Sequence, residues 1–179
     1  MSGRREIRVN DKILLKEIGL DDVEGIFNTI VGEQNYLKEW LPFVELTREI
    51  SFTQKFVEKY LNSDRTNLTC AIYYQHQFAG IVGLKDTDRD NKKTEIGYWM
   101  SESFQHKGIM TLSCKELIKY AFDEMNLNRI QLKAATGNLK SQRVAKRLGF
   151  KQEGIEREGE FLHHGFVDLV VFSLLKADR

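Results

Sequence analysis

The chain has 179 residues, with 27 lysines and arginines against 26 aspartates and glutamates, which gives a formal net charge of +1. Because the numbers of basic and acidic residues are nearly equal, the chain lacks the broad basic surface of a nucleic-acid-binding protein and any general attraction to anionic membranes. A chain of this length can bury a core without disulfides or a metal, and we expect a single domain covering residues 1–179.

The first third of the chain is predicted to be mainly helical after one short strand. Residues 13–15 form an apolar run typical of a strand, and Asp21 and Asp22 are then expected to cap a helix whose apolar residues recur at helical spacing over residues 23–30. Residues 34–44 are less regular and contain the only proline, Pro42, which predicts a bend.

A further helix is expected to begin at Thr47 or Ser51 and to end at Leu61. Its apolar residues share one predicted side. They are Phe52, Phe56, Val57, Tyr60 and Leu61.

The middle of the chain is predicted to form strands. Residues 68–74 and 78–84 form a hairpin around residues 75–77, residues 86–93 form a polar loop, and residues 95–100 form the next strand. Cys70 lies in a predicted strand and Cys114 in a predicted helix, and they do not have the spacing of a zinc site or a disulfide framework. We therefore expect both cysteines to be small residues of the core.

The last part alternates helices and strands. A long amphipathic helix follows Gly108, a strand covers residues 130–134, a short helix covers residues 139–148, and a last strand covers residues 168–175. One stripe of the long helix is predicted to face the core: Met110, Cys114, Leu117, Ile118, Ala121 and Met125. The order of elements indicates an α+β or mixed α/β fold.

The segment at residues 105–110 stands between a predicted strand and this long helix. A glycine at the start of a helix leaves the first backbone N–H groups open, and these donors together with the helix dipole form an anion site suited to a diphosphate. A glycine that only relieves steric strain in a turn is the alternative interpretation.

Several segments together resemble the GCN5-related N-acetyltransferase (GNAT) family, and within it the RimJ/RimL-type group that acetylates the N-termini of ribosomal proteins. These segments are residues 95–99, 105–110, 138–141, 147–150 and 165–168. The resemblance implies a mixed, twisted sheet that is splayed open at its middle, with acetyl-CoA in the opening. No apolar segment follows the basic residues 1–5, and no apolar run approaches the ~20 residues that span a bilayer, so we expect a cytoplasmic protein. The four histidines share no metal-ligand spacing, so we expect no metal.

The resemblance assigns the coenzyme A diphosphate to the backbone N–H groups of the segment around Gly108. The residues concerned are Gln105, His106, Lys107, Gly108, Ile109, Met110 and Thr111. Met110 replaces the glycine or alanine usual in the family, and because it fits the core stripe we expect its side chain to point away from the phosphates.

The pantetheine arm is expected to pair with the strand at residues 96–101, where a main-chain N–H of Trp99, Met100 or Ser101 would polarise the thioester carbonyl. Asn138 caps the following helix, binds pantetheine, or does both.

Two side chains are candidates for proton transfer. Ser141, in the first turn of the short helix, would donate a proton to the leaving sulfur, and Glu160 would accept one from the substrate amine. A solvated serine and an exposed glutamate are the alternatives. A protein α-amine has a pKa of about 7.7–8.0 and is partly neutral at cytosolic pH, so a weak base would be enough.

The acceptor is expected to be a protein N-terminus that meets Trp40 and Phe43 as one wall of its pocket, together with His163. Core packing is the alternative for the two aromatic residues, and surface placement is the alternative for His163 and His164. A small amine such as a polyamine or an aminoglycoside is the second acceptor class, and a non-catalytic acyl-CoA-binding module is the second kind of protein. The sequence leaves open whether the chain forms a homodimer. A dinucleotide-binding oxidoreductase is disfavoured because the glycine pattern is missing.

Overall fold

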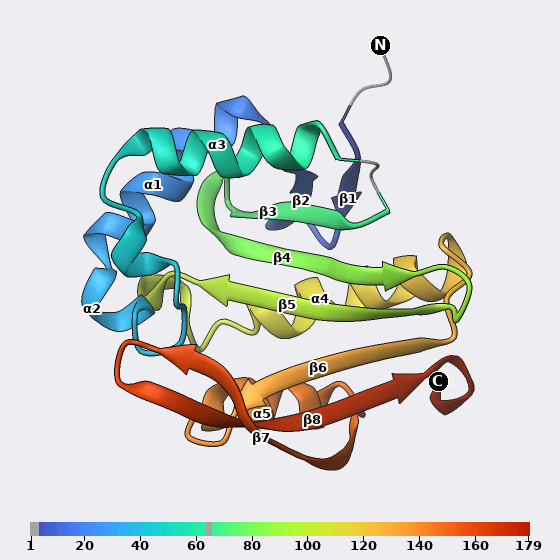
Figure 1. Ribbon diagram of the computed structural model, residues 1–179. Coiled ribbons are helices and arrows are strands. Elements are labelled where there is room, and N and C mark those ends of the chain that lie inside the picture. The colour runs from blue at the N-terminus through green and yellow to red at the C-terminus, as the bar shows by residue number, and fades with distance from the viewer. Residues whose placement is uncertain (1–3, 64–65) are drawn as a thin grey trace.

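The computed structural model describes residues 4–63 and 66–179, and within these ranges a central sheet has helices on both faces (Figure 1). The strand order is β1-β2-β3-β4-β5-β6-β8-β7, and every neighbouring pair is antiparallel except β5 and β6, which are parallel. The strands are β1 (Glu6–Arg8), β2 (Ile13–Glu17), β3 (Leu68–Tyr74), β4 (Gln77–Asp88), β5 (Lys93–Met100), β6 (Arg129–Ala135), β7 (Lys151–Leu162) and β8 (Gly165–Leu175). The predicted mixed α/β class is confirmed.

Five α-helices are present in the described residues, and they divide between the two faces of the sheet (Figure 1). They are α1 (Val23–Gly32), α2 (Gln34–Leu37), α3 (Ile50–Leu61), α4 (Ile109–Asp123) and α5 (Leu139–Arg147). None of the helices in the described residues is both long and apolar enough to span a bilayer.

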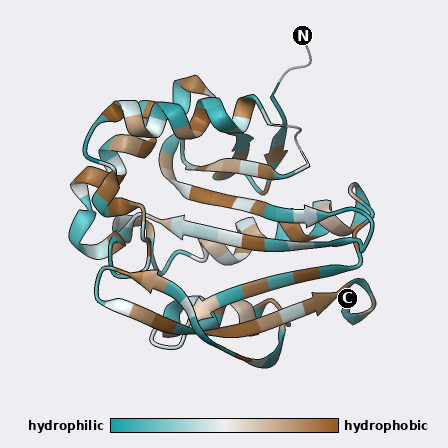
Figure 2. Ribbon diagram, in the orientation of Figure 1, coloured by the Kyte–Doolittle hydropathy of each residue, from teal (hydrophilic) through white to brown (hydrophobic). Residues whose placement is uncertain are grey.

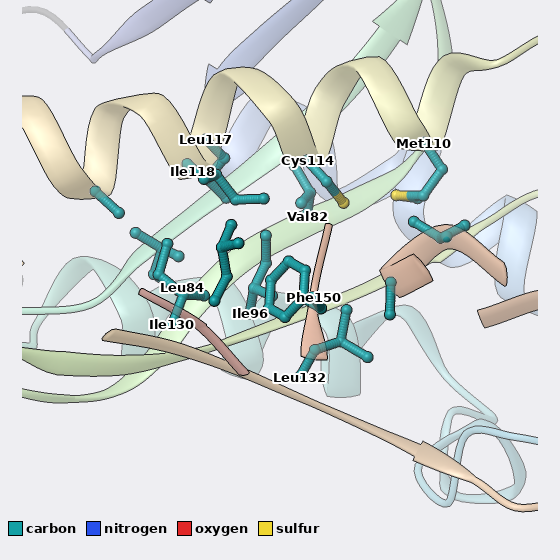
Figure 3. Close-up of a cluster of buried hydrophobic side chains, with 14 of the residues drawn as sticks. Val82, Leu84, Ile96, Met110, Cys114, Leu117, Ile118, Ile130, Leu132 and Phe150 are labelled. Atoms are coloured by element: carbon teal, nitrogen blue, oxygen red, sulfur yellow. The ribbon is translucent and has the colours of Figure 1, made fainter. Parts of the chain in front are cut away.

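The larger core lies between the sheet and α4 with α5. Figure 3 shows Cys114, Leu117 and Ile118 of α4 directed at apolar side chains from β4, β5 and β6. Both cysteines, Cys70 and Cys114, are buried and free, as predicted. Each Å² of apolar surface removed from water contributes roughly 25 cal/mol to stability. The many buried side chains of this core therefore hold α4 firmly against the strands that precede and follow it.

The smaller core lies on the opposite face, under α1 and α3. Strand residues alternate between the two faces, and along β6 Figure 2 shows hydrophobic residues alternating with hydrophilic ones. Ile130 and Leu132 belong to the α4 face, and Gln131 and Lys133 therefore point to the other face. The same alternation places Tyr98 on the α4 face and Trp99 on the α1 face.

The sheet opens between β5 and β6. The two strands pair only at their beginnings, where residues 93–95 lie beside residues 129–131. From Ile96 onward no strand of the described residues pairs with β5 on this side, and β5 and β6 diverge toward their carboxyl ends (Figure 1). The predicted splay is therefore present, and it leaves main-chain groups of β5 facing a gap.

Several element predictions need correction. The loop predicted at residues 86–93 is shorter, because β4 extends to Asp88 and β5 begins at Lys93. Strands β1 and β7 were not predicted, since their sequences lack an apolar run. The irregular segment after α1 contains one helical turn, α2, before the bend at Pro42.

Two side-chain predictions in the N-terminal part are wrong. Phe52 and Phe56 are 38% and 43% exposed, because α3 turns Thr53, Val57 and Tyr60 toward the sheet instead. Asp22 precedes α1 without capping it. Its carboxylate accepts from the N–H of Gly19 at 2.8 Å and from Tyr73 Oη at 2.5 Å.

Candidate functional site

The amino end of α4 presents backbone N–H groups for which the described residues supply no acceptor. Gly108 has a left-handed backbone with φ of 73°, which glycine adopts without strain, and it is exposed. The first intrahelical hydrogen bond runs from the N–H of Leu112 to the carbonyl of Gly108 at 3.0 Å. The N–H groups of residues 109–111 consequently have no intrahelical acceptor and point out of the helix.

The side chains of this turn leave the donors accessible. A Cβ built on Gly108 would meet no atom of more distant described residues within 4 Å, so the space beside this residue is open. Met110 is buried in the core under α4, as Figure 3 shows, which confirms that its side chain points away from this space. The turn therefore combines open donors with the positive end of a helix dipole.

Gln105 links three elements at the mouth of the gap. Its amide nitrogen donates to the hydroxyl of Tyr36 in α2, and its amide oxygen accepts from Lys140 Nζ in α5 at 2.9 Å. Lys140 also lies over the Tyr36 ring, 5.4 Å from its centre. The Lys140 ammonium is thus held against Gln105, a few residues before α4, where its charge attracts an anion.

The open edge of β5 offers main-chain groups to the gap. The N–H of Ser101 donates to the Ala79 carbonyl in β4 at 2.9 Å, so Ser101 cannot supply the predicted free donor. Successive backbone N–H groups point to opposite edges of a strand. The N–H of Trp99, two residues before Ser101, therefore also points toward β4, and the N–H of Met100 points away from it. Of the three residues predicted for this role, Met100 is the one whose N–H faces the gap.

Across the gap, α5 brings a hydroxyl pair together. Asn138 Oδ1 accepts from the N–H of Ser141 at 3.0 Å, so the predicted cap is present. Ser141 Oγ lies 2.9 Å from Tyr98 Oη of β5, which also donates to the Ser141 carbonyl at 3.3 Å. Burial raises the pKa of Tyr98, which therefore keeps its proton.

Tyr98 is a site residue that the sequence analysis did not identify. Its segment was predicted to pair with pantetheine through main-chain groups, with no role for the Tyr98 side chain, and its partner Ser141 follows 43 residues later. Strand alternation alone could have placed Tyr98 on the face covered by α4, where a polar hydroxyl needs a partner.

Glu160 lies on the opposite face of the sheet. Burial raises the pKa of its carboxyl group, and the positive charges of Lys85 and Lys133 oppose this shift while Glu95 adds to it. Lys85 pairs with Glu95 at 2.8 Å across β4 and β5. Because Glu95 is the last β5 residue that pairs with β6, Glu160 is close to the point where the two strands separate.

Trp40 reaches the same gap from the segment after α2. A Cβ atom built on Gly137 would lie 3.3 Å from the Trp40 ring. The indole therefore lies against the loop that leads into Asn138. Phe43 instead packs against the smaller core, which favours core packing over a place in the acceptor pocket for this residue.

His163 is placed at the turn between β7 and β8, where its Nδ1 lies 3.1 Å from the carbonyl oxygen of Lys38. The structure therefore brings this histidine to the segment that carries Trp40. His106 is exposed in the turn before Gly108 and has a left-handed backbone with φ of 62°.

Comparison with known proteins gives a consistent result. Residues 12–151 match the family described as acetyltransferase (GNAT) domain. The chain is 34% identical over 174 residues to the Bacillus subtilis (strain 168) protein named "Putative ribosomal N-acetyltransferase YdaF", which covers 96% of this chain and 95% of that protein. It is 25% identical over 169 residues to the ribosomal-protein-serine acetyltransferase of Escherichia coli (strain K12), with 93% and 94% covered.

A solved structure agrees in fold. The microcin C7 self-immunity acetyltransferase MccE, crystallised with acetyl-CoA and AMP, superposes with a TM-score of 0.90 at 30% identity. The alignment covers 97% of this chain and 96% of that one.

Proposed function

The chain belongs to the GNAT family of acetyltransferases, and from this membership we propose that it transfers the acetyl group of acetyl-CoA to the α-amino group of a protein N-terminus. Membership makes it an N-acetyltransferase. The acceptor is supported by the names of the two relatives that match almost the full chain, both of which refer to ribosomal acetylation.

Acetyl-CoA would supply an activated thioester, and the residues of the gap fit its chemistry. The N–H groups of residues 109–111 offer donors for the diphosphate, and Lys140 adds a positive charge nearby. The unpaired edge of β5 offers main-chain partners for an amide-rich arm. The N–H of Met100 then lies at the end of this edge, where it can polarise a carbonyl oxygen.

Ser141 serves as the proton donor on the α5 side. Tyr98 keeps its proton at neutral pH, and its hydroxyl can turn this proton from the Ser141 carbonyl to Ser141 Oγ, 2.9 Å away. The serine proton is then free for the departing sulfur. The cap from Asn138 fixes the first turn of α5 and therefore the position of this hydroxyl.

Glu160 serves as the base on the other face. A carboxylate with a raised pKa is a stronger proton acceptor than an ordinary surface glutamate, and the cause here is burial. The amine would approach from this face, where Trp40 borders the gap, and the proton it loses would pass to Glu160 directly or through a water molecule.

One observation carries the proposal: β5 pairs with β6 only over residues 93–95 and separates from it beyond Glu95, between the two faces of the sheet. Donor groups for a phosphate and a sulfur lie on the α4 and α5 side, and the candidate base lies on the other. An acyl group threaded through the gap would meet the amine from the opposite side, as direct transfer requires.

The acceptor is tested by incubating the full chain with acetyl-CoA and a panel of amines, followed by mass spectrometry. Peptides with a free N-terminus are compared with the same peptides blocked at the α-amine but retaining lysine, and with polyamines and aminoglycosides. We expect one added acetyl group on the free α-amine and none on the blocked peptides. Acetylation restricted to the small amines, or coenzyme binding without any product, contradicts the proposal.

The role of Ser141 gives a separate prediction. Ser141→Ala should lower kcat about tenfold while the affinity for acetyl-CoA stays nearly unchanged, because the lost proton acts only on the leaving group. The effect is moderate since a thiolate, with a thiol pKa of about 8.5, leaves without much help.

Steady-state kinetics and calorimetric titration with acetyl-CoA measure these two quantities for Ser141→Ala. Ser113→Ala is the matched control, because this buried serine lies in α4 away from the gap and its hydroxyl has no hydrogen-bond partner among the described residues. An unchanged kcat in Ser141→Ala removes this residue from the mechanism.

A further inference from the structure

Three side chains with metal-binding atoms meet beside the acceptor side of the gap. Glu39 lies in the segment after α2, and His163 and His164 form the turn between β7 and β8. One ligand atom from each lies within 4.8 Å of the other two. Figure 1 shows the β7–β8 turn next to the segment that follows α2, although the two are far apart in sequence.

We propose that Glu39, His163 and His164 form a binding site for one Zn²⁺ ion or a similar divalent transition-metal ion. Two imidazoles and one carboxylate are the ligand types that Zn²⁺ uses in proteins, and a water molecule would complete four-coordination. The ion takes no part in acetyl transfer, and its effect is to join the two chain segments.

The distances suit this coordination. Four ligands at about 2.0–2.1 Å from Zn²⁺ in a tetrahedron stand roughly 3.3 Å from one another. His163 Nε2 is 3.6 Å from Glu39 Oε1, and a ligand atom of His164 lies within 4.8 Å of the ligand atoms of the other two residues. The His163 and Glu39 side chains are 24% and 49% exposed, so both can adjust by the small movement that common coordination needs.

A backbone group orients one of the ligands. The carbonyl oxygen of Lys38 lies 3.1 Å from His163 Nδ1 and accepts a hydrogen bond from it when this nitrogen carries the ring proton. A ring held in this way presents Nε2, the nitrogen that faces Glu39, as its metal-binding atom. Metal-bound histidines commonly have their second nitrogen fixed by such a carbonyl.

The position of the site gives it a structural consequence. Glu39 adjoins Trp40, and the β7–β8 turn closes the hairpin that carries Glu160. A bound ion would therefore hold together the two segments that border the proposed acceptor side of the gap. Sequence spacing could not reveal this, because Glu39 and His163 are separated by more than a hundred residues.

The test is calorimetric titration of the full, metal-free chain with Zn²⁺ alone, with thermal unfolding recorded in parallel. We expect one site, and we expect Zn²⁺ to raise the Tm because it binds only the folded form. Both effects should disappear in the double variant His163→Asn/His164→Asn, and Glu39→Gln should bind roughly tenfold more weakly.

His76→Asn is the matched control. His76 lies in the turn between β3 and β4 with φ of 68°, a backbone that asparagine accepts, and it has no part in the cluster. It should bind Zn²⁺ as the unchanged chain does. Equal Zn²⁺ affinity in the folded double variant and in the unchanged chain, or no Zn²⁺ binding by the unchanged chain, overturns the proposal.

Discussion

Gly108→Asp should weaken coenzyme A binding about 10²- to 10³-fold without unfolding the protein. The new carboxylate would stand at the amino end of α4, where it would occupy the free backbone donors and repel a diphosphate. Aspartate tolerates a left-handed backbone better than most residues and is favourable at a helix N-terminus, so the fold should keep its stability. Calorimetric titration with coenzyme A and thermal unfolding together measure the two effects.

Two asparagine variants separate charge from backbone strain in this experiment. Gly108→Asn has nearly the same size as the aspartate variant without its charge, and it should lose much less affinity. Gly149→Asn introduces the same residue at another left-handed glycine, with φ of 83°, just after α5, and it should bind coenzyme A normally. Normal binding by a folded Gly108→Asp variant would mean that the diphosphate does not lie at this turn.

Glu160→Gln should lower kcat/KM about a hundredfold at neutral pH, because the amide cannot accept a proton from the amine. The pH dependence carries the sharper signature. The active form of Glu160 is the carboxylate, so kcat/KM of the unchanged enzyme rises with pH through the raised pKa of this group and through the pKa of the amine. In the Glu160→Gln variant, kcat/KM should rise with pH only through the pKa of the amine.

The ratio of the two activities should therefore shrink as the pH falls, since protonation disables Glu160 in the unchanged enzyme as well. Glu158→Gln is the control for this experiment, because Glu158 is an exposed glutamate of the same strand. Its pH profile should match that of the unchanged enzyme. Full kcat/KM in Glu160→Gln at neutral pH, where Glu160 of the unchanged enzyme is a carboxylate, would exclude Glu160 as the base.

Local patterns predicted much of the fold. The strand–glycine–helix order at Gly108 and the cap at Asn138 depend on neighbouring residues, and both are present as expected. Strand β7 was not predicted because it is an edge strand with polar residues on much of its length, and an edge strand depends on its partner β8 more than on its own sequence. The buried side of α3 was misplaced because tertiary packing, rather than the count of apolar residues, sets its orientation.

The candidate site could be predicted only in part, because its members come from distant parts of the chain. The pair between Tyr98 and Ser141 depends on how α5 packs against β5, and the environment of Glu160 depends on where β7 lies relative to Lys85 and Glu95. The loss of Ser101 as a free donor follows from the pairing of β5 with β4. None of these relations has a signature in short segments of sequence.

The central claim is that the gap between β5 and β6 holds acetyl-CoA, with its diphosphate on the amino end of α4. A crystal structure of the protein with coenzyme A tests this most directly. The account predicts phosphate oxygens within hydrogen-bond distance of the N–H groups of residues 109–111 and the sulfur near Ser141 Oγ. Coenzyme A bound elsewhere on the molecule, with the gap filled by side chains, would contradict it.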